Sequence, residues 1–171
     1  MSAVNRRAAD ADLADIEAVY RCRLAEFQRV ATAITGSREA GRDAVQDAFA
    51  RAVHRRAQFR QEGSLEGWIW RIVVTCARDA GRRVAATRTL FLEEGGDVGE
   101  VGTTPASDPD DVRGLVARLP ERQRLVLFLR YYADLDYGAI AHVLAISGGT
   151  VGATLNQARD ALRNLMTEVT R

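Results

Sequence analysis

The stretch from Leu119 to Met166, LPERQRLVLFLRYYADLDYGAIAHVLAISGGTVGATLNQARDALRNLM, decides how the rest of the chain is interpreted. Its last segment begins at Ser147, whose hydroxyl can cap a helix N-terminus. Beyond this cap, apolar residues recur at steps of three and four, as on one face of an α-helix: Val151, Leu155, Ala158, Leu162 and Leu165. Asp136 can cap a shorter helix before it, and the link at 145–147 leaves room only for a sharp turn. The pattern predicts a helix-turn-helix.

This predicted helix-turn-helix has two interpretations. In DNA-binding proteins the second helix usually enters the major groove, whereas a helical hairpin that only completes a core has the same spacing. From Ser147 to Ala158 the sequence carries no charge, and Arg159 is the first cation. Because neutralisation of phosphates by Arg or Lys supplies much of DNA affinity, we expect this helix to bind duplex weakly unless its neighbours compensate.

Three longer helices are predicted upstream. The first begins at Asp10 or Asp12 and ends at Gly36, with apolar residues at steps of three and four. Ser37 can cap a second helix with a continuous apolar stripe, and a third spans about 64–83 with a serine at its start. Three helices of this size can bury a shared core without a sheet, which predicts an all-α protein.

The charges are segregated along the chain, although the net charge is only +1. Residues 1–88 carry 16 Arg against 11 acidic residues, and residues 112–171 carry 8 Arg against 5. Between them, residues 89–111 hold 7 acidic residues and no base, and the surrounding sequence is rich in Gly and Thr. This composition predicts a flexible acidic linker. Two basic blocks around an acidic strip favour a nucleic-acid partner.

Metal and catalytic sites are not indicated. Cys22 and Cys76 lie far apart without a CxxC motif, so we expect small apolar core residues rather than zinc ligands. His54 and His142 have no Ser, Cys or carboxylate at catalytic spacing and are expected to be exposed or half-buried. No cofactor is expected. Because no catalytic cluster is indicated, the protein is not expected to be an enzyme. The sequence lacks an apolar run of about 18 residues and a signal-peptide pattern, which predicts a cytoplasmic protein that is not inserted in a membrane.

Several short motifs resemble the bacterial sigma-70 family, in its compact extracytoplasmic-function (ECF) branch. The motifs that resemble region 4 are LPERQ at 119–123, LRYY at 129–132 and SGGTV at 147–151. Those that resemble region 2 are DAVQDAF at 43–49 and GSLEGWIWRI at 63–72. They occur in the order that the family has.

The resemblance implies three parts in an all-α chain. A three-helix region 2 domain would occupy 10–88, a flexible acidic linker 89–109, and a four-helix region 4 domain with the helix-turn-helix 110–171. In the family, region 2 docks on RNA polymerase and melts the minus-ten promoter element, while region 4 binds the minus-thirty-five element. The implied partners are core RNA polymerase, promoter DNA and an anti-sigma factor.

By resemblance, the polymerase-binding residues lie on the second predicted helix: Asp43, Gln46, Asp47 and Arg51. Arg42 departs from the family, which commonly has an acidic residue there. Without the resemblance, these outer charges are interpreted as a solvated helix face.

The third predicted helix carries the side chains expected to hold melted DNA. Opening a duplex costs about 1.4 kcal/mol per step, which a protein offsets by stacking a base on an aromatic ring and holding the strand in a basic groove. The expected DNA-binding residues are Trp70, Arg71, Arg78, Arg82 and Arg83. The alternatives are that Trp70 is a core residue and that Arg78 forms a solvated pair with Asp79. Trp68 is expected in the core, and Thr75 and Gly81 depart from the family.

On the helix-turn-helix, the residues expected at DNA are Thr150, Thr154, Asn156, Gln157 and Arg159, with Asn and Gln suited to adenine. The predicted function is a transcription initiation factor that binds core RNA polymerase, directs it to promoters and helps to melt them. One alternative is a sigma-derived adaptor or inhibitor that no longer reads DNA, as the uncharged helix allows. The other is a stand-alone helix-turn-helix repressor, which predicts tight duplex binding without polymerase.

Overall fold

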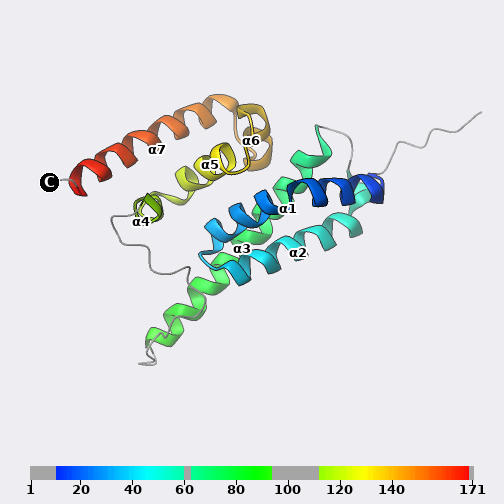
Figure 1. Ribbon diagram of the computed structural model, residues 1–171, viewed down its shortest axis with the longest axis horizontal. Helices are drawn as coiled ribbons and strands as arrows, with labels where there is room; N and C mark the ends of the chain where they lie inside the picture. Colours follow the sequence, from blue (N-terminus) through cyan, green and yellow to red (C-terminus); the bar gives the residue numbers. More distant parts are fainter. Residues whose placement is uncertain (1–10, 60–62, 94–111, 170–171) are drawn as a thin grey trace, which may run out of the picture.

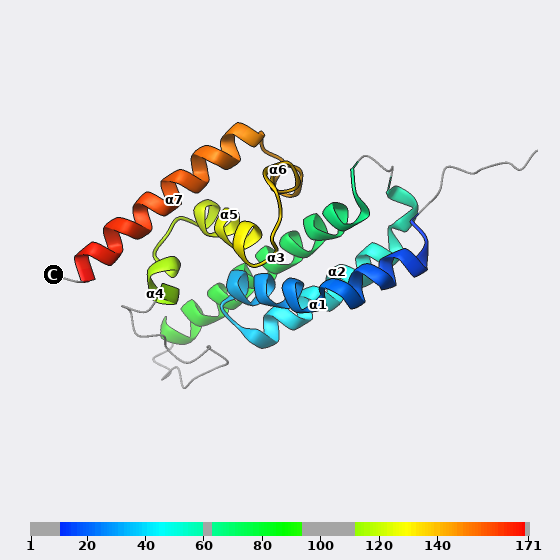
Figure 2. The same cartoon turned by 45° about the horizontal axis from the view of Figure 1, so that its top comes forward.

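The computed structural model describes residues 11–59, 63–93 and 112–169. Within these ranges the chain consists of helices and connecting turns, with no β-strand, which confirms the all-α prediction. Figures 1 and 2 show two groups of helices, which we call the N-terminal lobe and the C-terminal lobe.

The N-terminal lobe contains three α-helices and one short 3-10 helix: α1 (Leu13–Thr35), α2 (Arg38–His54), η1 (Arg56–Gln58) and α3 (Leu65–Glu93). The C-terminal lobe contains four α-helices: α4 (Val112–Ala117), α5 (Glu121–Tyr131), α6 (Tyr137–Leu144) and α7 (Gly148–Val169). The connection between α6 and α7 is three residues long and forms the expected helix-turn-helix.

Local hydrogen bonds at the helix starts confirm the predicted caps. The Asp12 carboxylate accepts from a backbone N–H at the start of α1 at 3.4 Å, and the Ser37 and Ser64 hydroxyls do the same for α2 and α3 at 3.3 and 3.0 Å. In the C-terminal lobe, Asp136 accepts at 2.7 Å and Ser147 at 3.1 Å. Each contact satisfies a backbone donor that has no partner inside its helix.

The end of α3 differs from the prediction. α3 ends at Glu93 rather than near Arg83, because the ten residues after Arg83 contain neither Gly nor Pro and continue the helix. The helix therefore extends into the first part of the predicted linker. The remainder of the predicted acidic linker lies outside the described residues.

The core of the N-terminal lobe is formed where α1, α2 and α3 pack together. Its largest fully buried side chains include Phe27 from α1, Val45 from α2, and Ile69 and Trp70 from α3. α1 and α2 approach closely at Gly41, where a Cβ atom would lie only 2.7 Å from the backbone nitrogen of Thr32. The absence of a side chain at this position therefore permits the helix spacing.

The C-terminal lobe packs α5 and α6 against α7 around Leu129, Ile140, Val151 and Leu155, all fully buried. The two lobes also contact each other: α6 packs on α3, and α5 approaches α1. The buried apolar side chains of both lobes form one contiguous cluster. In Figure 2, α5 and α6 lie along α3 and the end of α1. The predicted domains are thus packed together in this structure.

Candidate nucleic-acid interface

Trp70 was predicted to stack on DNA, and the structure contradicts this prediction. Its exposed fraction is 0%, and its ring lies 4.3 Å from that of Phe27 between centroids. The indole Nε1 is also buried and has no hydrogen-bond partner within the described residues. Trp70 follows Ile69 and precedes Val73 and Ala77 on the buried face of α3, so it belongs to the core.

Trp68 was expected in the core, but its ring is only partly buried. It packs against Phe59, which follows η1, with ring centroids 5.6 Å apart and a tilt of 49°. Trp70 is therefore buried where contact with DNA was expected, and Trp68 is partly exposed where burial was expected. The orientation of α3 about its own axis explains this difference. The face of α3 that packs on α1 and α2 contains positions 69, 70 and 73 rather than 65, 68 and 72.

The four arginines predicted on α3 are all exposed: Arg71, Arg78, Arg82 and Arg83. Asp79 forms its ion pair with Arg82, one turn further along α3, and not with Arg78 as the alternative interpretation proposed. The Thr75 hydroxyl donates to the backbone carbonyl oxygen of Arg71 at 2.8 Å. Gly81 lies where a Cβ atom would approach the Ile34 carbonyl oxygen to 3.2 Å, which explains the small residue there.

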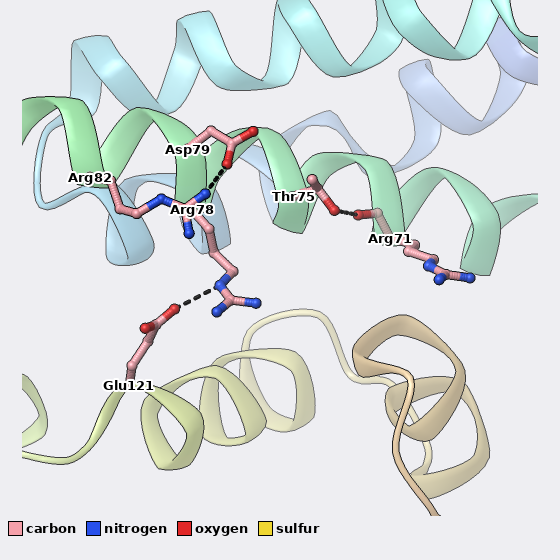
Figure 3. A network of polar contacts seen from close by, with 6 residues as sticks. All are labelled: Arg71, Thr75, Arg78, Asp79, Arg82 and Glu121. Carbon is pink, nitrogen blue, oxygen red and sulfur yellow. Dashed lines mark hydrogen bonds and ion pairs between the residues drawn. The ribbon is translucent and has the colours of Figure 1, made fainter.

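Arg78 links the two lobes. Its Nε lies 2.7 Å from the Glu121 carboxylate at the start of α5, and Figure 3 shows this ion pair spanning from α3 to α5. Both side chains are about half exposed, at 44% and 54%, and such pairs contribute about 0.2–1 kcal/mol. The ion pair therefore orients the lobes more than it holds them together.

His142 lies at the other end of this contact between lobes. Its side chain is exposed, as predicted, but its ring faces the start of α3. A Cβ atom at Gly63 or at Gly67 would lie 3.7 Å from the imidazole carbons, which is van der Waals distance. α6 thus rests on the turn that precedes α3 and on its first turn. The contacts of Glu121 and His142 with the N-terminal lobe were not predicted, because nothing local in the sequence indicates a contact between distant segments.

The residues predicted to bind polymerase share the outer face of α2. Asp43, Gln46, Asp47 and Arg51 are all exposed, whereas Ala44, Val45 and Ala48 on the opposite face are buried. None of the four side chains takes part in an ion pair with another described residue. Their charges are available to a partner.

On α7, the structure contradicts one of the predicted DNA contacts. Thr154 has an exposed fraction of 6%, because it lies on the same face as the buried Val151, Leu155 and Ala158. Asn156 and Gln157 are exposed, as a base-contacting role requires. Thr150 is half-buried, and its hydroxyl lies 2.8 Å from that of Ser147 in the helix cap.

Arg159 is exposed and is held by a residue of α5. Its Nε and Nη2 atoms donate to the Tyr131 hydroxyl at 3.1 and 2.7 Å. Because the Tyr131 hydroxyl accepts these hydrogen bonds, the pKa of the Arg159 guanidinium is raised. The sequence did not predict this pair, since 28 residues separate its members.

The two cysteines do not lie in a catalytic or metal-binding cluster of described residues. Cys76 is buried, and burial raises the pKa of its thiol. Cys22 is exposed, contrary to the core position expected for it. In the described ranges, no three His, Cys, Asp or Glu side chains are grouped to hold a metal ion. No single helix among these residues is long and apolar enough to cross a membrane; only α6 and α7 taken together, bent by 99°, meet that criterion.

Comparisons with known proteins agree with this arrangement. Residues 19–87 match Sigma-70 region 2, and residues 110–162 match Sigma-70, region 4. The ECF RNA polymerase sigma-E factor of Escherichia coli K12 is 31% identical over 141 residues, which cover 71% of each chain. RNA polymerase sigma factor YlaC of Bacillus subtilis is 28% identical over 162 residues, covering 90% of this chain and 92% of that protein.

A solved structure has the same fold. CnrH, in complex with the cytosolic domain of CnrY, superimposes with a TM-score of 0.70 at 20% sequence identity, covering 94% of this chain and 93% of that one. The sequence relatives are named as sigma factors, which favours an initiation factor over an adaptor or a stand-alone repressor. The two matched regions, in this order and on these helices, place the chain in the sigma-70 family of RNA polymerase sigma factors, in its ECF branch.

Proposed function

We propose that this sigma factor binds core RNA polymerase through the outer face of α2 and contacts promoter DNA through the arginines of α3 and the exposed face of α7. The proposal rests chiefly on one observation: in both matched regions, polar and charged side chains lie on exposed helix faces that do not pack in the core. Directing polymerase to promoters is the function of the family to which the chain belongs.

On α3, the exposed arginines are the groups that would hold a melted strand. Arg71 and Arg83 have no ion-pair partner among the described residues, so their guanidinium groups are available to phosphates. Arg78 and Arg82 are engaged by Glu121 and Asp79 and must exchange a carboxylate for a phosphate. Trp70 has no part in this step because it is buried.

On α7, Asn156 and Gln157 are the exposed side chains with donor and acceptor groups suited to base edges. Thr154 is excluded from this role by its burial. Because the helix from Gly148 to Ala158 carries no charge, its contribution to affinity depends on hydrogen bonds and on Arg159.

We further propose that the protein has no chemistry of its own, is cytoplasmic and is regulated by an anti-sigma factor. CnrH was solved with the cytosolic domain of CnrY, and this chain shares its fold. The family matches cover most of both lobes, and neither matched family is described as an enzyme.

Promoter-specific transcription with purified core polymerase tests the proposal. We expect the full-length protein to direct transcripts from defined start sites on native-host DNA. Absence of transcripts, with polymerase still captured, would instead support an adaptor. Tight duplex binding without polymerase would support a repressor.

Docking through α2 is tested by charge reversal at Asp47. Asp47→Lys should reduce capture of core polymerase by about tenfold or more, because placing like charges together at an interface costs several kcal/mol. Glu17→Lys on α1 is the control, since Glu17 is an exposed acidic residue outside the proposed interface. Equal capture by Asp47→Lys and the control would remove Asp47 from the interface.

A further inference from the structure

We infer that Tyr131 is a positioning residue, which orients Arg159 for contact with a DNA phosphate. The inference rests on the proposed function, because it assumes that α6 and α7 bind duplex DNA. It adds to that function a residue of α5, outside the helix-turn-helix, on which the affinity for DNA depends.

Arg159 has a particular weight because α7 carries no other charge before it. The eleven positions from Gly148 to Ala158 are all uncharged. After Arg159, Asp160 and Arg163 are paired with each other at 2.8 Å. Counted along α7 from the turn, Arg159 is therefore the first cation. Within the described ranges it has no carboxylate partner.

The contact with Tyr131 fixes one edge of the guanidinium and leaves the other free. A guanidinium has five N–H donors, and two of them, on Nε and Nη2, point at the Tyr131 hydroxyl. Three donors remain, including both on Nη1, which suffice for a phosphate oxygen pair. The guanidinium carbon lies 6.0 Å from the ring centroid, at the limit of a cation–π contact, so the hydrogen bonds dominate.

A neutral partner suits this role better than a carboxylate. Tyr131 restricts the rotation of the Arg159 side chain without neutralising its charge, so less freedom is lost when DNA binds. An acidic residue at the same place would compete with the phosphate. Tyr131 is 57% exposed and contributes little to the core, so stabilisation of the fold does not account for its contact with Arg159.

The chain provides a matched control. Tyr132 follows Tyr131, is 43% exposed, and stacks on Phe128 with ring centroids 5.6 Å apart. Removal of its hydroxyl changes the same chemical group one residue away, with no effect on Arg159. Both Tyr→Phe variants are expected to keep the melting temperature of the wild type.

The experiment measures promoter binding by the holoenzyme as a function of salt. The probes are several genomic fragments selected by the wild-type holoenzyme, and the variants are Tyr131→Phe, Tyr132→Phe, Arg159→Ala and the double variant of Tyr131 and Arg159. Arg159→Ala should weaken binding to all fragments and lower the salt slope by about 0.9, as loss of one phosphate contact does. Tyr131→Phe should weaken binding by about three- to tenfold, and should have no effect in the Arg159→Ala background.

Three results would overturn the inference: wild-type affinity for Tyr131→Phe, an equal loss in both backgrounds, or an equal loss for Tyr132→Phe. An Arg159→Ala variant with unchanged affinity and slope would overturn it as well, while leaving the proposed function intact. If the wild-type holoenzyme selects no fragment, the proposed function fails and the inference fails with it.

Discussion

Replacement of Trp70 separates a core role from a DNA-stacking role. The ring is fully buried beside Phe27, and truncation of such a side chain to Ala costs about 3–5 kcal/mol. Leu fills part of the space and removes the indole N–H, which has no hydrogen-bond partner in the described part of the chain and carries a desolvation cost of about 1–3 kcal/mol. We therefore expect Trp70→Leu to destabilise the protein by about 1–3 kcal/mol, less than Trp70→Ala.

The assay compares stability with promoter melting. For a chain of this size, 1 kcal/mol lowers the melting temperature by about 2–4 °C, so Trp70→Ala should lower it by about 6–20 °C. Promoter opening is measured by reactivity of unpaired thymines in the holoenzyme complex, at a temperature where both variants are folded. Trp70→Leu should open the promoter as the wild type does, although it has no aromatic face.

Arg71→Ala is the complementary variant. Arg71 is exposed and outside the core, so its truncation should leave the melting temperature unchanged and reduce promoter opening. If Trp70→Leu instead kept wild-type stability and lost promoter opening, the indole would act on DNA and its assignment to the core would be wrong.

Two further predictions concern the packing of helices. Glu121→Gln should change the ratio of closed to open lobes by at most about fivefold, because the exposed pair with Arg78 contributes about 0.2–1 kcal/mol; energy transfer between dyes on α1 and α7 measures this ratio, and complete opening would contradict the weak pair. Gly41→Ala should destabilise the protein by about 1–3 kcal/mol, because the new methyl group would meet the backbone of Thr32. Gly148→Ala is its control in thermal unfolding, because a Cβ atom at Gly148 would have no atom from another part of the described chain within 4 Å; an equal loss of stability in both variants would refute the clash.

The helix starts could be predicted from the sequence because each depends on a contact within three residues. Ser37, Ser64, Asp136 and Ser147 each have a side-chain oxygen that accepts from the backbone of the next turn. Such a contact needs no information from elsewhere in the chain. For the same reason the short turn between α6 and α7 was predicted correctly.

The exposure of single residues could not be predicted as well, because a helix with apolar residues on more than one side allows several rotations. α3 has apolar side chains at nearly every position from 68 to 74, and two different stripes fit this pattern. The packing of α1 and α2 selects the stripe that contains Trp70. On α7 the same ambiguity placed Thr154 at the DNA, although its spacing from Val151 and Ala158 puts it on the buried face.

The contacts between lobes have no signal in the sequence. Arg78 and Glu121 are separated by 43 residues, and each on its own is an ordinary charged residue on a helix surface. Their pairing depends on the position of α5 relative to α3, which follows from the packing of both lobes. The family resemblance predicts that Arg78 contacts DNA, but it gives no information about the contacts of Arg78 in the absence of DNA.

This closed arrangement leaves most of the proposed DNA face of α3 accessible. Of its four exposed arginines, only Arg78 is engaged by the C-terminal lobe, and a weak exposed pair is readily exchanged for a phosphate. Apolar packing opposes separation of the two lobes more strongly than this ion pair does. The buried clusters of the lobes are continuous, and separation would expose the surface where α6 rests on α3. Separation of the lobes therefore requires a partner that replaces this apolar contact, which the charged backbone of DNA does not do.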